Sequence, residues 1–133
     1  MSGDVAYLDT SAAVKLLLKE PETAALRRWL RSRPRRASAA LLRVELPRVV
    51  KRAGLPVLLN DCRRLLSGIQ LIRLDDMVLN VAGDLEPPSL RPLDAIHLAA
   101  ARSLAGDLDS VVTYDLRMIE AGQALGLSTI SPG

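Results

Sequence analysis

The feature that most constrains the fold is the alternation of short apolar stretches with helix-like segments. Strand patterns cover residues 4–8, 36–40, 69–74 and 110–114, and residues 127–130 are a candidate edge strand. The first helix pattern follows an N-cap at residues 10–11 and ends at residue 18, and the second covers residues 22–31. Two further helix patterns end at residue 52 and at about residue 66. The remaining three run from residue 75 or 76 to about 85, from 92 to 104 and from 115 to 125. Such alternation predicts an α/β domain whose mostly parallel sheet carries helices on both faces.

Size and composition predict one domain over residues 1–133. The chain has 133 residues, and its hydrophobic content of 49% is enough for a single core. Asp9 and Lys15 interrupt the most apolar N-terminal stretch, so we expect neither a signal peptide nor a membrane span. A lone cysteine, Cys62, cannot form an intramolecular disulfide and suits a reducing cytoplasm.

Positive charge is concentrated in residues 27–52. This block holds ten basic side chains and one acidic side chain, whereas the whole chain has a net charge of +3. Its members are Arg27, Arg28, Arg31, Arg33, Arg35, Arg36, Arg43, Arg48, Lys51 and Arg52. A solvated helix surface would explain some of them. Because guanidinium groups pair well with phosphates, the block also indicates a nucleic-acid partner.

Two aspartates follow predicted strands at the edge where parallel sheets bind ligands. Asp9 comes after the first strand, and Asp115 comes after residues 111–114. Each could simply cap the helix that follows it. Two strand ends that deliver carboxylates to one edge nevertheless favour a shared site.

Two further carboxylates lie on predicted helices. Asp94 is in the first turn after Pro92, where the helix dipole alone would justify it. Glu45 emerges from a largely aliphatic stripe, and an ion pair with Arg48 is the simplest structural explanation. A buried carboxylate without a partner is costly, which favours a metal ion or another basic partner. If the fold gathered all four carboxylates, the acidic pocket would require a divalent cation.

These residues carry a resemblance to a known family. The stretches that carry it are residues 7–12, the helical Glu45, residues 93–99 (LDAIHLA), residues 113–115 and the closing residues 121–132. In order and spacing they resemble PIN-domain ribonucleases, and more narrowly the VapC-type toxins of bacterial toxin–antitoxin pairs. The resemblance implies a PIN-like three-layer sandwich.

The resemblance also implies roles for particular residues. Asp9, Glu45, Asp94 and Asp115 would form the acidic tetrad that holds Mg²⁺ or Mn²⁺ for RNA cleavage, and the hydroxyls of Thr113 and Ser11 would support that site. The partners implied are an RNA substrate, a cognate antitoxin and a second copy in a homodimer, without a membrane. Pro47, two residues after Glu45, departs from the pattern of the family. Because proline removes a helical hydrogen bond, Pro47 bears on whether Glu45 reaches the other three carboxylates.

The chemistry of this ligand set suits phosphodiester hydrolysis. Mg²⁺ prefers oxygen ligands, and a bound divalent ion makes water a better nucleophile while offsetting phosphate charge. We expect Asp9 and Asp94 to be direct ligands and Asp115 to coordinate directly or through water. Glu45 would orient or deprotonate the attacking water, although a ligand role is equally compatible.

Other interpretations use the same residues differently. His97 is the only histidine, and we expect a hydrogen-bonded, partly buried side chain instead of a catalytic one. A phosphoaspartyl phosphatase or receiver would also place Asp9 at a strand end, but the last lysine is Lys51, and Ser11 stands where an Asp-x-Asp motif needs its second aspartate. A catalytically idle PIN domain that binds RNA or protein is the remaining alternative.

Overall fold

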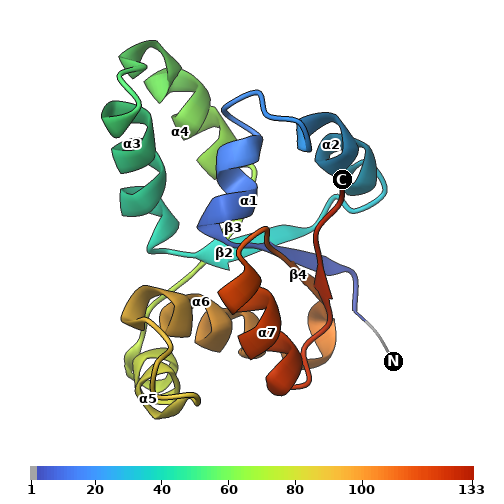
Figure 1. Cartoon of the computed structure of the whole chain (residues 1–133), viewed down its shortest axis with the longest axis vertical. Helices are drawn as coiled ribbons and strands as arrows, with labels where there is room; N and C mark the ends of the chain where they lie inside the picture. Colours follow the sequence, from blue (N-terminus) through green and yellow to red (C-terminus); the bar gives the residue numbers. More distant parts are fainter. Residues whose placement is uncertain (1–2) are drawn as a thin grey trace.

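A sheet of five parallel strands runs through the molecule in the order β3-β2-β1-β4-β5 (Figure 1). The computed structural model describes residues 3–133, so the first two residues of the expected domain lie outside it. The strands are β1 (Val5–Leu8), β2 (Arg36–Ala39), β3 (Gln70–Ile72), β4 (Leu108–Val112) and β5 (Thr129–Ile130). The expected parallel sheet, including the edge strand, is confirmed.

Helices connect successive strands. They are α1 (Thr10–Lys15), α2 (Thr23–Leu30), α3 (Leu42–Arg52), α4 (Leu59–Ser67), α5 (Asp76–Asp84), α6 (Pro92–Arg102) and α7 (Leu116–Ala124), with short 3₁₀ turns η1 (Pro56–Leu58) and η2 (Ala105–Asp107). The α7 helix ends before Gly126, whose φ of 78° reverses the chain into β5 in a conformation that glycine adopts without strain.

The helices form two layers around the sheet (Figure 1). Successive β1 side chains point to opposite faces, so Ala6 and Leu8 pack with α1, α2, α3 and α4, while Val5 and Tyr7 pack with α5 and α6. Helix α7 joins the second layer through Met118 and Ala121. The PIN-like three-layer α/β sandwich expected from the sequence is confirmed.

Several expected boundaries are wrong, including those of β3 (expected 69–74) and α6 (expected 92–104), and two have clear local reasons. Helix α1 ends at Lys15 instead of residue 18, and the Thr23 hydroxyl donates to the Lys15 carbonyl oxygen over 2.7 Å, which satisfies a terminal carbonyl without a further helical turn. Strand β4 covers residues 108–112 instead of 110–114, because Leu108 already pairs with Val5. Thr113 therefore lies just beyond the strand, at the same edge as Asp9.

Candidate active site

Asp9 is the most buried carboxylate of the site. Its side chain is 4% exposed and accepts three hydrogen bonds: from the Ser11 hydroxyl (2.6 Å), from the Thr113 hydroxyl (2.6 Å) and from the backbone N–H of Ala12 (3.0 Å). Burial raises the pKa of Asp9, although these donors act in the opposite direction. The bond to Ala12 caps α1, so Asp9 serves as an N-cap and also presents a carboxylate at the sheet edge. A carboxylate has about four acceptor positions, so about one remains for another ligand.

Thr113 connects Asp9 to the other strand-end aspartate. While its hydroxyl donates to Asp9, it accepts from the backbone N–H of Asp115 over 3.1 Å. Ser11 makes a parallel link, because its hydroxyl accepts from the backbone N–H of Tyr114 over 2.9 Å. The side chains of Thr113 and Ser11 thus fix the ends of β1 and β4 relative to each other. Both residues were expected at the site from the sequence, and the structure brings them to Asp9.

Asp115 caps α7 and acts electrostatically on Asp94. One carboxylate oxygen of Asp115 accepts from the backbone N–H of Arg117 over 2.9 Å. Asp94 lies in the first turn of α6 and is partly exposed. Burial raises the pKa of Asp94, and the negative charges of Asp115 and Asp9 raise it further, against the opposing charges of His97 and Arg91. Asp94 is therefore an electrostatic neighbour of both Asp115 and Asp9.

Glu45 belongs to a separate hydrogen-bonded chain at the same edge. Its Oε1 accepts from the Thr10 hydroxyl over 2.6 Å and lies 2.7 Å from Nε2 of His97. The other ring nitrogen of His97, Nδ1, lies 2.7 Å from the hydroxyl of Tyr7. Burial would raise the pKa of Glu45, but the hydrogen bond and charge of His97, with the Thr10 hydroxyl, outweigh burial and lower the pKa. Sequence reasoning did not identify Thr10 or Tyr7 as partners of this carboxylate.

The hydrogen bonds that His97 makes with Tyr7 and Glu45 determine its tautomer. Burial raises the pKa of Tyr7 well above its usual value, so the phenol keeps its proton. When the imidazole is neutral, the phenol donates to Nδ1 of His97, and the ring proton resides on Nε2, facing Glu45. His97 is 2% exposed, and it is a buried, hydrogen-bonded histidine as the sequence led us to expect.

The contacts of Glu45 bear on two expectations from the sequence. Helix α3 continues through Pro47, and Glu45 still reaches Thr10 and His97. Among residues 3–133, no ion pair joins Glu45 to Arg48, so the structural explanation suggested by helical spacing does not apply. The partner of Glu45 is instead His97, which is distant in sequence.

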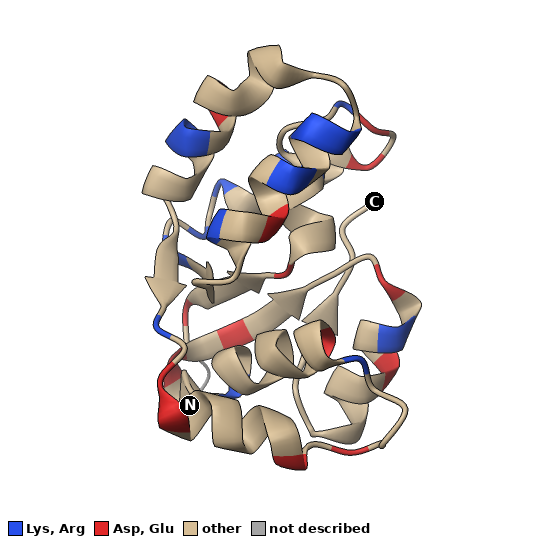
Figure 2. Cartoon of the chain, turned by 90° about the vertical axis from the view of Figure 1, so that its left-hand side faces the viewer, with Lys and Arg blue, Asp and Glu red and all other residues tan. Residues whose placement is uncertain are grey.

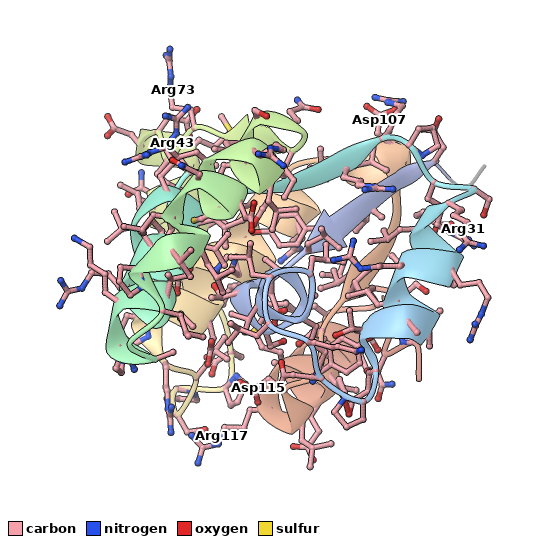
Figure 3. The ribbon with its side chains drawn as sticks, turned by 90° about the horizontal axis from the view of Figure 1, so that it is seen from above. Arg31, Arg43, Arg73, Asp107, Asp115 and Arg117 are labelled. Atoms are coloured by element: carbon pink, nitrogen blue, oxygen red, sulfur yellow. The ribbon has the colours of Figure 1, made fainter. Side chains whose placement is uncertain are left out.

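Part of the basic block lies away from this edge. In Figure 2 the ribbon is blue, the colour of Lys and Arg, at several positions in the layer of α1 to α4. Arg35 pairs with Asp4 at 2.7 Å, and Arg33 lies 3.4 Å from Asp109. Arg36 opens β2 and donates to backbone carbonyls. All three are near the amino ends of the strands, whereas Asp9 follows the carboxyl end of β1. In the view of Figure 3, Arg31 likewise lies far from Asp115 and Arg117.

The residues present fit a divalent cation that also binds substrate. No three His, Cys, Asp or Glu side chains form a ready-made metal cluster within the described part of the chain. Mg²⁺ is commonly held by one or two carboxylates together with waters and substrate phosphate oxygens, and so needs no complete protein cage. Asp9 offers a remaining acceptor position, and the pKa of Asp94 is raised first by burial and then by the negative charges of Asp115 and Asp9. The donor set is oxygen only, as a hard cation requires.

The family model for the PIN domain matches residues 6–123 of the chain. The chain belongs to the PIN-domain family. This PIN domain is similar over nearly its whole length to proteins of Mycobacterium tuberculosis. It is 48% identical over 126 residues to Ribonuclease VapC46, covering 95% of this chain and 96% of the relative. Identity is 44% over 131 residues to Ribonuclease VapC47 and 40% over 131 residues to Ribonuclease VapC35, each with 96% of both chains covered.

These comparisons confirm the resemblance to VapC-type proteins. The family match contains all four carboxylates, since Asp9, Glu45, Asp94 and Asp115 lie within residues 6–123. It favours the nuclease interpretation over the phosphoaspartyl alternatives. None of the helices of this PIN domain within residues 3–133 is both long and apolar enough to cross a bilayer.

Proposed function

We propose that this PIN domain is a metal-dependent endoribonuclease that hydrolyses RNA phosphodiester bonds and acts as the toxin of a toxin–antitoxin module. The observation that carries the proposal is the position of Asp9. Its carboxylate is buried at the carboxyl edge of the sheet and is held by the hydroxyls of Ser11 and Thr113, and its charge acts on Asp94 together with that of Asp115. The ribonuclease names of its relatives support the same activity.

The proposed cofactor is Mg²⁺, with Mn²⁺ as a substitute. Asp9 and Asp94 would hold the ion directly, and the oxygen of Asp115 that does not cap α7 would bind it directly or through water. When bound, the ion supplies charge neutralisation at the scissile phosphate and a more acidic water. Ser11 and Thr113 keep the Asp9 carboxylate in one orientation, which lowers the reorganisation needed when substrate arrives.

Glu45 has the geometry of a proton acceptor for the attacking water. Oε1 is engaged by Thr10 and His97, while Oε2 has no hydrogen-bond partner in residues 3–133. The hydrogen bond to His97 keeps Glu45 ionised, as a general base must be at neutral pH. We propose that Oε2 orients the water and accepts its proton, and that His97 and Thr10 position the carboxylate without touching substrate.

The partners and location follow from kinship with VapC-type toxins. We propose a cognate antitoxin protein, a homodimer and a cytoplasmic location, with residues 1–133 as one nuclease domain. The connection between α3 and α4 offers a candidate dimer surface, because Leu55 and Val57 are 40% and 79% exposed there. The single cysteine, Cys62, is buried and free, which suits a reducing compartment.

Cleavage mapping on total cellular RNA tests the function. The wild type should produce discrete cuts with Mg²⁺ or Mn²⁺ and none with chelator. Asp9→Asn should reduce the rate by about two or more powers of ten, because it removes a charge that would face the cation. Asp84→Asn, which makes the same change at an exposed position on α5, is the matched control and should cut normally. Equal cutting by the chelated sample or by Asp9→Asn would contradict the metal mechanism.

A further inference from the structure

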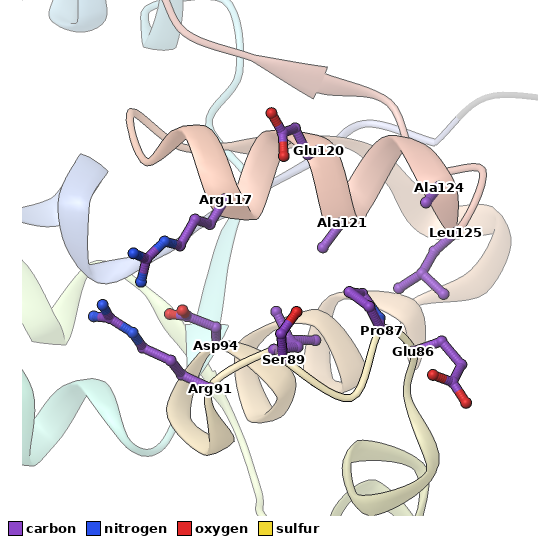
Figure 4. A pocket seen from close by; sticks show the side chains of 11 residues that line it. Glu86, Pro87, Ser89, Arg91, Asp94, Arg117, Glu120, Ala121, Ala124 and Leu125 are labelled. Carbon is purple, nitrogen blue, oxygen red and sulfur yellow. The ribbon is translucent and has the colours of Figure 1, made fainter.

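A cavity opens directly from the active site between the loop at residues 86–91 and helix α7. Its volume is about 790 Å³, within the range of about 300–1,000 Å³ typical of small-molecule sites. Asp94 lines it, so the cavity begins at one of the candidate metal ligands (Figure 4). Its walls are mainly apolar, from side chains that include Pro87, Leu90, Ala121 and Leu125.

Two arginines lie at the end of the cavity beside Asp94. The side chains of Arg91 and Arg117 extend toward the same space from different elements, the loop before α6 and the first turn of α7 (Figure 4). Arg91 acts electrostatically on Asp94. Both arginines are exposed, and neither guanidinium has an ion pair or a side-chain hydrogen bond anywhere in residues 3–133. Two free guanidinium groups beside the catalytic edge are ready to bind a phosphate.

The end of the cavity away from the two arginines has the opposite charge. Glu86 lies there, whereas Glu120 lies one helical turn from Arg117 with its carboxylate turned away from the cavity (Figure 4), and both are exposed. A carboxylate repels phosphate, so Glu86 favours the orientation in which the phosphate of a nucleotide lies beside Arg91 and Arg117 and its base lies against the apolar walls. RNA is commonly recognised through single-stranded bases that leave the stack and enter such pockets.

We propose that this cavity is a nucleotide subsite, in which the base adjacent to the scissile phosphate lies between Leu90 and α7 while Arg91 and Arg117 hold a backbone phosphate. The inference rests on the proposed ribonuclease function. It assigns phosphate recognition to two arginines outside the basic block at residues 27–52 and gives the enzyme a means of base selection with few aromatic side chains.

Small nucleotides test the subsite without knowledge of the RNA target. Binding of each of the four nucleoside 5′-monophosphates and of ribose 5-phosphate would be followed by NMR chemical-shift titration at millimolar concentration. At least one mononucleotide should bind more tightly than ribose 5-phosphate and shift the amides of residues 86–91 and 117–125. Arg91→Gln and Arg117→Gln should each weaken mononucleotide and ribose 5-phosphate binding by about five- to tenfold, as expected for a lost charge-assisted bond that is partly screened by solvent.

A filled cavity provides the second arm. Ala124 lines the cavity and is exposed, so Ala124→Trp should obstruct the base without disturbing the core. This variant should lose the preference for mononucleotides and retain ribose 5-phosphate binding. Gln123 is a neighbouring exposed residue that does not line the cavity, so Gln123→Trp is the control and should behave as wild type. Arg102→Gln, at the far end of α6, is the control for the arginine variants.

Two results would overturn the inference. One is the absence of mononucleotide shifts around the cavity at millimolar concentration, as expected if the cavity takes a segment of a protein partner. The other is equal behaviour of Ala124→Trp and Gln123→Trp. If the wild type cuts cellular RNA with metal while either result is obtained, the subsite is wrong and the ribonuclease function stands. Mononucleotide binding without RNA cleavage would instead contradict the function.

Discussion

Neutralising two carboxylates of the same site should change stability in opposite directions. Asp94→Asn and Glu45→Gln each replace a carboxylate by an amide of the same shape and remove one negative charge. The surroundings of the two differ, since burial and the charges of Asp115 and Asp9 disfavour ionised Asp94, whereas His97 and Thr10 favour ionised Glu45. We expect the metal-free Asp94→Asn protein to be more stable than wild type and the Glu45→Gln protein to be less stable.

The magnitudes follow from the contacts. Asp94 is partly exposed, so relief of repulsion is worth about 0.5–1 kcal/mol after solvent screening, and loss of its favourable position in the first turn of α6 offsets part of this. Glu45 exchanges charge-assisted bonds of about 1.5–3 kcal/mol for neutral ones of about 0.5–1.5 kcal/mol, a loss of about 1 kcal/mol. The two variants should therefore differ by about 1–2 kcal/mol, or several degrees in melting temperature.

The pH dependence of the free energy of unfolding tests the two opposite effects independently. The folded-state pKa of Asp94 is raised, so its stabilising effect is present below the unfolded value near 3.8 and is lost as pH rises through the folded pKa. The folded-state pKa of Glu45 is lowered, so its contribution is present above about 4.5 and is lost as pH falls through the folded pKa. As pH rises, the wild type should lose stability through Asp94 and gain stability through Glu45. Asp94→Asn should abolish that loss, and Glu45→Gln should abolish that gain.

The assay is thermal and urea unfolding of the wild type and both variants between pH 3 and pH 8 in chelator. Asp84→Asn serves as the control for loss of one surface charge. If both variants lose stability at neutral pH, Asp94 is a structural residue of the α6 N-terminus, and the reasoning from a shared acidic pocket is refuted.

Three further outcomes are expected. Added Mg²⁺ should raise the melting temperature of wild type more than that of Asp94→Asn, because a ligand that binds only the folded state stabilises it by mass action; equal gains would place the ion elsewhere. Tyr7→Phe should lower the free energy of unfolding in urea by about 1–3 kcal/mol, since it leaves Nδ1 of buried His97 without a partner. An unchanged unfolding midpoint would contradict the hydrogen-bonded chain from Tyr7 through His97 to Glu45. Thr113→Val keeps the shape of the side chain but removes the donor to Asp9, so calorimetric Mg²⁺ affinity and RNA cleavage should both fall; unchanged affinity would deny Thr113 a supporting role.

Much of the architecture was predictable because periodicity and strand ends are local signals. Alternating segments indicate the parallel sheet, and the positions of Asp9 and Asp115 after strand patterns predict that both lie at its carboxyl edge. Sequence alone does not separate a capping role of Asp9 from a metal-binding one, and the Ala12 bond shows that capping occupies only part of the carboxylate. Metal ligation itself stays a prediction.

The contacts that sequence reasoning missed join residues distant in the chain. Glu45 and His97 are 52 residues apart, and Tyr7 and His97 are 90 apart, so helical spacing pointed to the neighbouring Arg48 instead. The charge pattern does not single out Arg91 and Arg117, because the dense block at residues 27–52 dominates it. Their closeness in sequence to Asp94 and Asp115 was the available signal.

The hydroxyl of Thr113 has a consequence for the nascent chain. It reaches Asp9 across 104 residues of sequence, and the Tyr114 hydroxyl and the Ser131 hydroxyl make further bonds between the β4–α7 turn and the segment after β5. A ribosome that has synthesised only β1 to α6 therefore carries Asp9, Glu45 and Asp94 without the strand that orients the first of them. Contacts of such long range also form late in folding. A PIN domain built in this way would lack an oriented Asp9 carboxylate until its C-terminal segment has emerged from the ribosome.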